Sequence, residues 1–371
     1  MSLREEIETE IRDHGPMPFS RYMELCLYHP TLGYYSRTAE QFGKAGDFYT
    51  SSDVCAVYGR LLARQFNEIW QQLGRPTQIE VLELGPGRGL FARDVLDWIN
   101  KKFADFFEAL TYTLQESSPA LRAKLRENLR EHIAAGKASI SEGKPNPGVQ
   151  RFLSASIPLI IFANEFFDAL PVEILGTRGK LHVALENSRL SEIWLPPLAE
   201  ELEFLDRYSV HPVAGERLEV PLVSQQWIEK ICEAMQRGLL LIVDYGYSRN
   251  DQLAGRYHGT LMSYRHHSAS SNPFEAPGEQ DLTAHVNFTA LAAACERAGL
   301  KCEKLGTQSQ FLMGIGEQNQ FADAFEECRL PQERAKVALQ LKHLITPAGM
   351  GDNFQVLVAS RAAEIRQTIA H

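Results

Sequence analysis

Alternation between short apolar runs and amphipathic stretches starts at residue 79 and predicts a series of β-α-β units. Four apolar runs have the length of strands and end in glycine or polar residues; they are 79–85, 110–116, 157–165 and 238–246. Apolar positions recur at helical spacing between the first three runs, in 91–107 and 119–133. Units of this kind build a parallel sheet with helices on both faces, so the pattern predicts an α/β fold.

The N-terminal region follows another pattern. Ser2 and Glu5 form a capping box that opens a short helix, and apolar residues from Val54 to Leu73 predict a longer one. Residues 29–53 lie between these helices and are rich in Gly, Ser and Tyr. Long loops inside compact domains are usually functional, so we expect this loop to close over a ligand.

Two further regions complete the predicted organisation. Residues 306–316 and 353–361 are interpreted as two late strands around a helical stretch at 317–345. Residues 176–236 are too long for one crossover, and their mixed pattern predicts extra β structure followed by a helix. We therefore expect a helical N-terminal cap with a cofactor-covering loop (1–75), a Rossmann-like core (76–175 and 237–371) and an inserted α+β lid (176–236).

Composition and charge exclude several classes of protein. The 371 residues include 38 basic and 47 acidic side chains, a net charge of −9. No basic stripe of the kind that binds nucleic acid is present, and the basic run around Arg122 also contains acids and is interpreted as a solvated helix face. No apolar run approaches the ~20 residues of a membrane span. We expect neither nucleic-acid binding nor membrane insertion.

Cysteine usage and the first residues indicate a compartment. The six cysteines are scattered without a CxxC pair, which predicts free thiols in a reducing environment. The first residues, MSLREEIETEIRDHG, are acidic and amphipathic, unlike a secretory signal or an Arg-rich transit peptide. We expect a cytoplasmic protein of bacterial origin. The sequence does not decide the oligomeric state, and a homodimer stays open.

A glycine-rich turn after the first strand carries the strongest chemical signal. Gly85 and Gly87 begin a G-x-G-x-G turn in which Leu90 stands where a dinucleotide-binding G-x-G-x-x-G motif has its third glycine. Glu83 precedes the turn by two residues. S-adenosylmethionine (SAM) has no phosphate but a positive sulfonium and an amino-acid tail, so an acid beside open backbone suits it. The turn predicts a SAM site that includes Glu83, Gly85 and Gly87; NAD stays the weaker alternative.

A second acid follows the second strand. Glu116 ends the run LTYTLQE, where a carboxylate can accept both ribose hydroxyls of an adenosine. Alternatively, Glu116, Ser117 and Ser118 cap the next helix. We favour the ribose role and add Glu116 to the cofactor site.

Three polar residues follow the third strand. Asn164, Glu165 and Asp168 lie at its carboxyl end, where ligands bind in open α/β sheets. We predict a cofactor contact for Asn164 and catalytic roles for Glu165 and Asp168. Glu165 is otherwise a solvated loop acid and Asp168 a helix cap.

A polar cluster near residues 259–288 supplies one more candidate. His285 is a catalytic candidate there, although a structural role explains it equally well, and Thr289 is expected to cap the following helix. His266 and His267 have no cysteine partner at zinc-ligand spacing, and H-E-x-x-H is absent, so no metal site is predicted.

Seven motifs carry a resemblance to a known family. In chain order they are LCLYHPTLGYYS, GDFYTS, VLELGPGRG, LQESSP, NEFFDALPVE, VDYGY and QDLTAHVNF. Together, over roughly residues 15–360, they resemble the MidA family of SAM-dependent methyltransferases. The resemblance implies a class I methyltransferase fold, SAM as cofactor and a protein arginine as acceptor. Mitochondrial members dimethylate an arginine of a core complex I subunit, so a respiratory complex subunit is the partner that the resemblance implies.

The resemblance also implies site residues and shows two departures. It implies cofactor contacts at Asp47, Thr50, Gly85, Gly87 and Glu116. The family usually has Asp where this chain has Asn287, and a Pro-containing version commonly replaces SDVCAVYG after GDFYTS.

The sequence thus favours methyl transfer to nitrogen by positioning and electrostatics. Arginine stays protonated and presents a rigid fork of donors, so Glu165 and Asp168 are the expected pair that holds it. The alternatives are a small-molecule N- or O-methyltransferase and a non-catalytic assembly factor that binds SAM.

Overall fold

The computed structural model describes residues 2–37, 56–141, 157–233, 235–252, 259–265, 268–317 and 319–362. The chain divides into two compact units, each assembled from three separate stretches. The small-sheet unit contains 1–48, 167–227 and 246–291. The large-sheet unit contains 49–166, 228–245 and 292–371.

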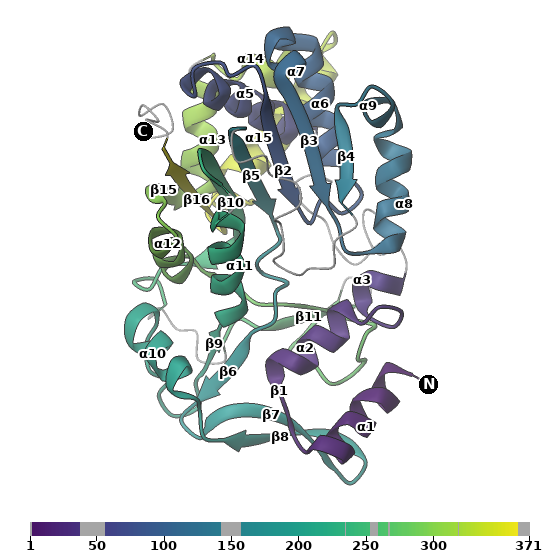
Figure 1. Cartoon of the computed structure of the whole chain (residues 1–371), viewed down its shortest axis with the longest axis vertical. Helices are drawn as coiled ribbons and strands as arrows, with labels where there is room; N and C mark the ends of the chain where they lie inside the picture. Colours follow the sequence, from purple (N-terminus) through teal and green to yellow (C-terminus); the bar gives the residue numbers. More distant parts are fainter. Residues whose placement is uncertain are drawn as a thin grey trace. The chain divides into compact units, whose positions relative to one another are not determined.

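A mostly parallel sheet forms the centre of the large-sheet unit. Its strands follow the order β15, β16, β10, β5, β2, β3, β4 (Figure 1). Their bounds are β2 Ile79–Leu84, β3 Leu110–Gln115, β4 Ala138–Ser141, β5 Leu159–Asn164, β10 Gly238–Tyr247, β15 Lys301–Thr307 and β16 Phe354–Arg361. The strands from β10 to β4 pair in parallel, whereas β16 is antiparallel to both β10 and β15. This arrangement confirms the predicted Rossmann-like α/β fold with an antiparallel late strand.

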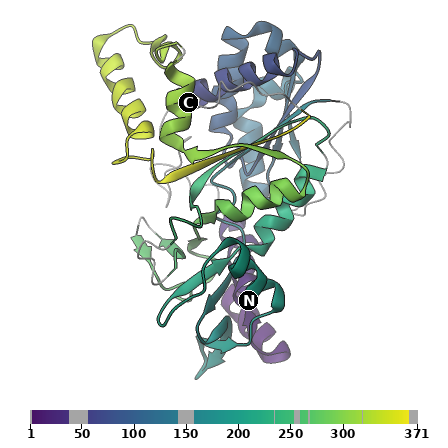
Figure 2. The same cartoon turned by 90° about the vertical axis from the view of Figure 1, so that its left-hand side faces the viewer.

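Helices cover both faces of this sheet, which explains why its central strands are continuously apolar. Every residue of β2 is buried, as expected for a parallel strand covered on two sides. Figure 2 shows α5 and α6 on one side of the sheet and α12 on the other. The helix bounds are α5 Ala56–Gln72, α6 Leu90–Lys102, α7 Ala104–Ala109, α8 Pro119–Asn128, α9 Arg130–Ala134, α11 Leu222–Glu233 and α12 Phe288–Arg297.

The predicted strand at 306–316 is wrong. Most of this segment forms helix α13 (Gln308–Glu317), and the strand β15 lies before it. Thr307 and Gln310 explain the difference because they form a reciprocal cap. The Thr307 hydroxyl accepts the Gln310 N–H at 3.3 Å, and the Gln310 side chain accepts the Thr307 N–H at 3.1 Å. This T-x-x-Q pattern is a helix-start signal that outweighs the apolar run after it.

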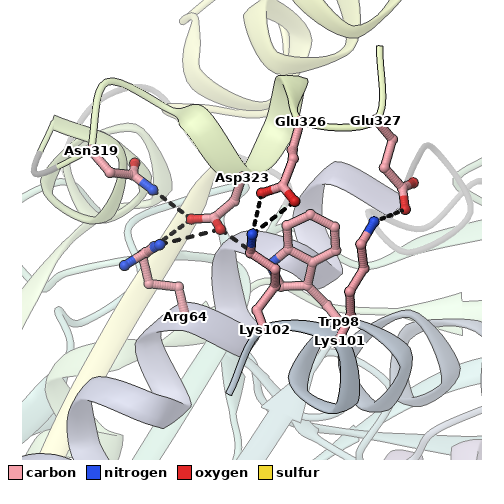
Figure 3. A network of polar contacts seen from close by, with 8 residues as sticks. All are labelled: Arg64, Trp98, Lys101, Lys102, Asn319, Asp323, Glu326 and Glu327. Carbon is pink, nitrogen blue, oxygen red and sulfur yellow. Dashed lines mark hydrogen bonds and ion pairs between the residues drawn. The ribbon is translucent and has the colours of Figure 1, made fainter. Parts of the chain in front are cut away.

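Two more helices, α14 (Ala322–Phe325) and α15 (Pro331–Ile345), fill the predicted helical stretch. Asp323 anchors this region to α5 and α6 (Figure 3). Its buried carboxylate accepts hydrogen bonds from the Arg64 guanidinium, from Trp98 Nε1 at 3.2 Å and from Asn319 Nδ2 at 2.6 Å. Beside Asp323, two more exposed ion pairs join Lys101 to Glu327 and Lys102 to Glu326.

The small-sheet unit combines an N-terminal helical segment with two antiparallel sheets. Its helices are α1 Leu3–His14, α2 Phe19–Tyr28, α3 Tyr34–Arg37 and α10 Ala199–Tyr208. One sheet joins β1 Met17–Pro18, β7 Gly179–Glu186, β6 Glu173–Gly176 and β9 Arg217–Val220, with β8 Arg189–Leu195 along β7. The other joins β12 Ser268–Ser270, β11 Met262–Arg265 and β13 Asp281–Thr283. The Ser2–Glu5 capping box that opens α1 is confirmed.

The predicted division into cap, core and lid stays a prediction. The structure places α5 in the large-sheet unit, whereas the sequence assigned residues 1–75 to one cap. The extra β structure and helix expected in 176–236 are present as β7, β8, α10 and β9. Among the described helices, none combines the length and apolar character that crossing a membrane requires.

Candidate functional site

The strand order of the large sheet fixes where a ligand can bind. From β2 the chain continues to β3 and β4 on one side, and then returns to β5 and β10 on the other. The loops after β2 and β5 therefore diverge, and open α/β sheets bind their ligands in the crevice at such a switch point, outside the carboxyl ends of the two strands. Gly85 follows β2 and Glu165 follows β5, so both lie at this edge.

The glycine turn after β2 combines close packing with open space. Gly85, Gly87 and Gly89 have φ of +63°, +56° and +75°, a backbone region that favours glycine. A Cβ atom on Gly85 would lie 2.9 Å from the Phe166 ring, so this glycine allows close packing. A Cβ atom on Gly87 would meet no heavy atom of the described residues within 4 Å. The open space beside Gly87 fits the expected tail of a bound SAM molecule.

Glu116 lies directly after β3 and is held at the glycine turn. Its side chain is buried and accepts the Ser118 N–H at 2.8 Å. Burial raises the pKa of Glu116 to about 7, and hydrogen bonds from the backbone of Ser118 and Gly87 oppose this shift. The Ser118 hydroxyl caps α8 by accepting the Leu121 N–H. Glu116 therefore contacts both strand-end loops, with a carboxylate that ionises near neutral pH.

Glu83 differs from Glu116 in its environment. It is buried and accepts a hydrogen bond from the Tyr112 hydroxyl at 2.8 Å. Burial raises the pKa of Glu83 to about 8, and the charge of Glu116 adds to the increase. The Glu83 carboxyl is therefore mostly neutral at pH 7, and its predicted cofactor contact stays a prediction.

Helix α8 fixes the loops after β2 and β3 through residues that the sequence did not single out as site residues. Arg122 Nη1 donates to the main-chain oxygens of Glu116 at 3.1 Å and Ser117 at 2.7 Å. Asn128 Nδ2 donates to the Arg88 oxygen at 2.8 Å. The interpretation of Arg122 as part of a solvated helix face is therefore wrong. The position of Arg122 in the helix pattern could not reveal this role, because its partners are main-chain atoms of a loop.

Glu165 has an unusual backbone after β5. Its φ is +51°, which is uncommon for a residue with a side chain and marks a strained position. Backbone hydrogen bonds hold it, because its N–H donates to Val243 O at 3.0 Å and the next N–H donates to Asp244 Oδ2 at 3.1 Å. Its half-buried carboxylate accepts a hydrogen bond from Asn164 Nδ2 at 3.1 Å. Glu165 is thus an oriented acid at the crevice.

Asp168 and His285 belong to the small-sheet unit, unlike Glu165. Asp168 is buried, and a turn rather than a helix follows it, so the helix-cap alternative is wrong. Burial raises the pKa of Tyr264, and the charges of Asp168 and Asp281 raise it further, which places both acids near this ring. The Tyr35 hydroxyl donates to Asp281 at 2.9 Å. His285 is half-buried, and its backbone N–H donates to the Thr260 hydroxyl at 2.9 Å.

The family departure at Asn287 has a structural explanation. Asn287 ends β14 (Val286–Asn287), and its Oδ1 accepts the Ala290 N–H at 3.0 Å. Its Nδ2 donates to Tyr208 O at 3.0 Å. Asn287 therefore caps α12, and the prediction that Thr289 does so is wrong; Thr289 accepts the Arg249 N–H instead. An amide serves both partners, whereas an ionised Asp cannot donate to a carbonyl.

Several sequence candidates lie outside the described residues. These are Asp47, Thr50, His266 and His267. Within the described ranges, His, Cys, Asp and Glu side chains form no group of three that could hold a metal ion.

Comparison with known proteins gives one family match. Residues 61–306 match a family described as "Putative S-adenosyl-L-methionine-dependent methyltransferase". The mitochondrial protein arginine methyltransferase NDUFAF7 homolog of Drosophila melanogaster is 29% identical, over 96% of this chain and 84% of its own length. The mitochondrial protein arginine methyltransferase NDUFAF7 of Homo sapiens is 26% identical, over 93% and 80% respectively.

A solved structure is similar over the whole chain. The crystal structure of a Burkholderia thailandensis protein described as a "likely methyl transferase", bound to S-adenosyl-homocysteine, has a TM-score of 0.84 and 27% sequence identity. The similarity covers 100% of this chain and 94% of that one.

Proposed function

Because the chain belongs to the MidA family of SAM-dependent methyltransferases, we propose that it transfers the methyl group of SAM to arginine side chains of a protein. The observation that carries the proposal is the arrangement at the switch point of the large sheet. An open glycine turn and buried Glu116 lie after β2 and β3, and the oriented acid Glu165 lies after β5. The relatives named as protein arginine methyltransferases supply the acceptor class.

The residues at the turn fit SAM. The bound cofactor supplies an electrophilic methyl group on a positively charged sulfur. In this proposal the Glu116 carboxylate accepts the ribose hydroxyls, and the backbone beside Gly87 leaves room for the amino-acid tail. Glu83, Asp47 and Thr50 complete the proposed cofactor site, and the cofactor contact predicted for Asn164 stays a prediction.

Glu165 is proposed to hold the acceptor. An arginine guanidinium is always charged at neutral pH and presents planar pairs of N–H donors, which a carboxylate binds in a fixed orientation. Its position at the end of β5 lets Glu165 orient the guanidinium at the crevice where the cofactor binds. The catalytic roles predicted for Asp168 and His285, which belong to the small-sheet unit, stay predictions.

Replacement of Glu165 tests this assignment. We expect Glu165→Gln to lower the rate of methyl transfer about 10- to 150-fold, because a charged hydrogen bond is worth roughly 1.5–3 kcal/mol. SAM affinity, measured by calorimetry, should stay at the wild-type value. A wild-type rate would show that Glu165 is only a solvated acid, and a parallel loss of affinity would place it in the cofactor site instead.

Labelled SAM distinguishes the alternative functions. After incubation of the enzyme with tritiated SAM and a cell lysate, we expect label in protein. Label confined to small molecules would support the small-molecule methyltransferase alternative. SAM binding without any transfer would support the non-catalytic assembly factor.

The proposal includes a location and partners. We propose a cytoplasmic enzyme whose protein substrate is a respiratory complex subunit, as the family resemblance suggests. The described cysteines are free thiols, in keeping with a reducing compartment. Cell fractionation checks the location, and light scattering checks whether the enzyme is a homodimer.

A further inference from the structure

We propose that Tyr58 is a positioning residue for Glu165 and acts through the side chain of Asn164. The inference rests on the proposed function, in which Glu165 holds the acceptor guanidinium. All three residues belong to the large-sheet unit. The sequence pattern accounts for Tyr58 only as an apolar position of α5 and does not explain its hydroxyl.

Two hydrogen bonds connect Tyr58 with the acid. The Tyr58 hydroxyl donates to Asn164 Oδ1 at 2.9 Å, and Asn164 Nδ2 donates to Glu165 Oε1 at 3.1 Å. Packing holds the Tyr58 ring in place, because Tyr58 is only 1% exposed and its ring centroid lies 5.6 Å from that of Phe91. A rigid helix residue thus determines the position of the amide that contacts Glu165.

The direction of the hydrogen bonds explains why the hydroxyl matters. A primary amide has a donor end and an acceptor end, whereas an ionised carboxylate can only accept. When Tyr58 donates to Oδ1, the NH₂ group of Asn164 faces the Glu165 carboxylate. Without the hydroxyl the amide is free to turn over, which brings two acceptors together and moves the carboxylate away.

Two further observations support this role. Burial raises the pKa of Tyr58 well above its ordinary value, and the charge of Glu165 raises it further, so the hydroxyl keeps its proton. The strained backbone of Glu165, with φ of +51°, is fixed by main-chain hydrogen bonds. Those bonds fix the main chain of Glu165, whereas the two hydrogen bonds from Tyr58 through Asn164 fix the direction of its carboxylate.

The test is a double-mutant cycle of Tyr58→Phe and Glu165→Gln. The rate measured is the initial transfer of label from saturating tritiated SAM to protein of a cell lysate. Loss of one neutral hydrogen bond is worth about 0.5–1.5 kcal/mol, so we expect Tyr58→Phe to lower the rate about 2- to 12-fold. Affinity for S-adenosylhomocysteine, measured by calorimetry, should not change, because the inference assigns the Asn164 side chain to Glu165 and not to the cofactor.

In the Glu165→Gln background, Tyr58→Phe should have little further effect. A Gln side chain can pair with either end of the Asn164 amide, so the orientation of that amide no longer matters. Non-additive losses of this kind are the signature of residues that act through each other. Tyr22→Phe is the matched control, because it removes another buried hydroxyl, which donates to Pro273 O at 2.7 Å. It should leave the rate unchanged.

The outcomes separate this inference from the proposed function. Equal losses from Tyr58→Phe in both backgrounds would overturn the inference alone, as would a wild-type rate for Tyr58→Phe. Reduced S-adenosylhomocysteine affinity would also overturn it, because Tyr58 would then act on the cofactor site. If the wild type labels no protein, the proposed function fails, and the inference fails with it.

Discussion

At the scale of single residues, different hydrogen-bond donors give two buried glutamates different properties. Glu116 and Glu83 are both buried near the carboxyl edge of the large sheet, and burial raises the pKa of Glu116 to about 7 and that of Glu83 to about 8. Backbone N–H groups face Glu116, whereas the Tyr112 hydroxyl faces Glu83. Glu116 is therefore the acid that can be charged when a ligand arrives at neutral pH.

Cofactor affinity should consequently depend on pH. The ionised form of Glu116 accepts the ribose hydroxyls, so protonation competes with binding. Below a pKa of about 7 the affinity for S-adenosylhomocysteine should fall, by up to about tenfold per pH unit, and above it the affinity should level off. Calorimetry between pH 5.5 and 8.5 checks this expectation.

Glu116→Gln provides the second half of this test. At pH 8 this variant should bind S-adenosylhomocysteine about 10- to 150-fold more weakly than the wild type, because the charged acceptor of the ribose hydroxyls is lost. Its affinity should depend little on pH. Glu80→Gln is the matched control, because Glu80 is a buried acid in the middle of the sheet, in β2, and accepts a hydrogen bond from Thr113. If the affinity of the wild type for S-adenosylhomocysteine does not change with pH, the proposed contact of Glu116 with the ribose is refuted.

The sequence predicted the acids at the strand ends but missed their partners. Glu116 and Glu165 could be found because parallel strands bring their carboxyl ends to one edge. Tyr58 and Arg122 could not, since both lie on helices and their roles depend on which loop each side chain reaches. Hydrogen-bond direction is a tertiary property, and residue spacing does not encode it.

At the scale of elements, the turn between β2 and α6 is the part most specific to a ligand. We expect Gly87→Val to abolish cofactor binding, because a branched side chain would fill the open space beside the turn. The substitution also strains the backbone, whose φ is +56°. Calorimetry with S-adenosylhomocysteine measures the affinity, and circular dichroism checks the fold.

Gly136→Val is the control that separates backbone strain from loss of space for the cofactor. Gly136 also has a positive φ of +71°, and no heavy atom of the described part of the chain lies within 4 Å of its Cβ position, but it precedes β4, at the amino end of that strand. This variant should lose about 1–3 kcal/mol of stability and keep the cofactor. Retained binding in Gly87→Val would place the cofactor elsewhere.

The attachment of the 319–327 segment to α5 and α6 makes a second element-scale prediction. Asp323→Asn should lower the free energy of unfolding by about 1.5–3 kcal/mol, because Arg64 loses its charged partner at a buried site (Figure 3). Glu327→Gln changes an acid that is 46% exposed and should cost less than about 1 kcal/mol. Urea unfolding of both variants measures the difference, and equal costs would contradict it.

The error at 306–316 shows why some elements could not be predicted from hydrophobicity. The residues after Thr307 are apolar enough for a strand, yet its reciprocal cap with Gln310 starts a helix. Local hydrogen bonding decided the structure there, whereas burial on both faces decided it for β2 and β5.

At the scale of the whole molecule, the chain builds each compact unit from three separate stretches. The sequence predicted the α/β core because its strands are continuously apolar, but it assigned 1–75 to a single cap. Helix α5 belongs to the large-sheet unit because its apolar face, including Leu61, Leu62 and Phe66, packs in the core of that unit. Which stretches share a core depends on long-range packing, which the pattern of residues along the chain does not encode.

Identification of the methylated amino acid decides whether this chain is a protein arginine methyltransferase. Protein labelled by the enzyme and tritiated SAM is hydrolysed to amino acids, and the labelled product is separated by chromatography and identified by mass spectrometry. We predict that the label is in methylated arginine and that Glu165→Gln greatly reduces it while SAM still binds. Label in methyllysine, or in a small molecule with none in protein, would contradict the proposed function.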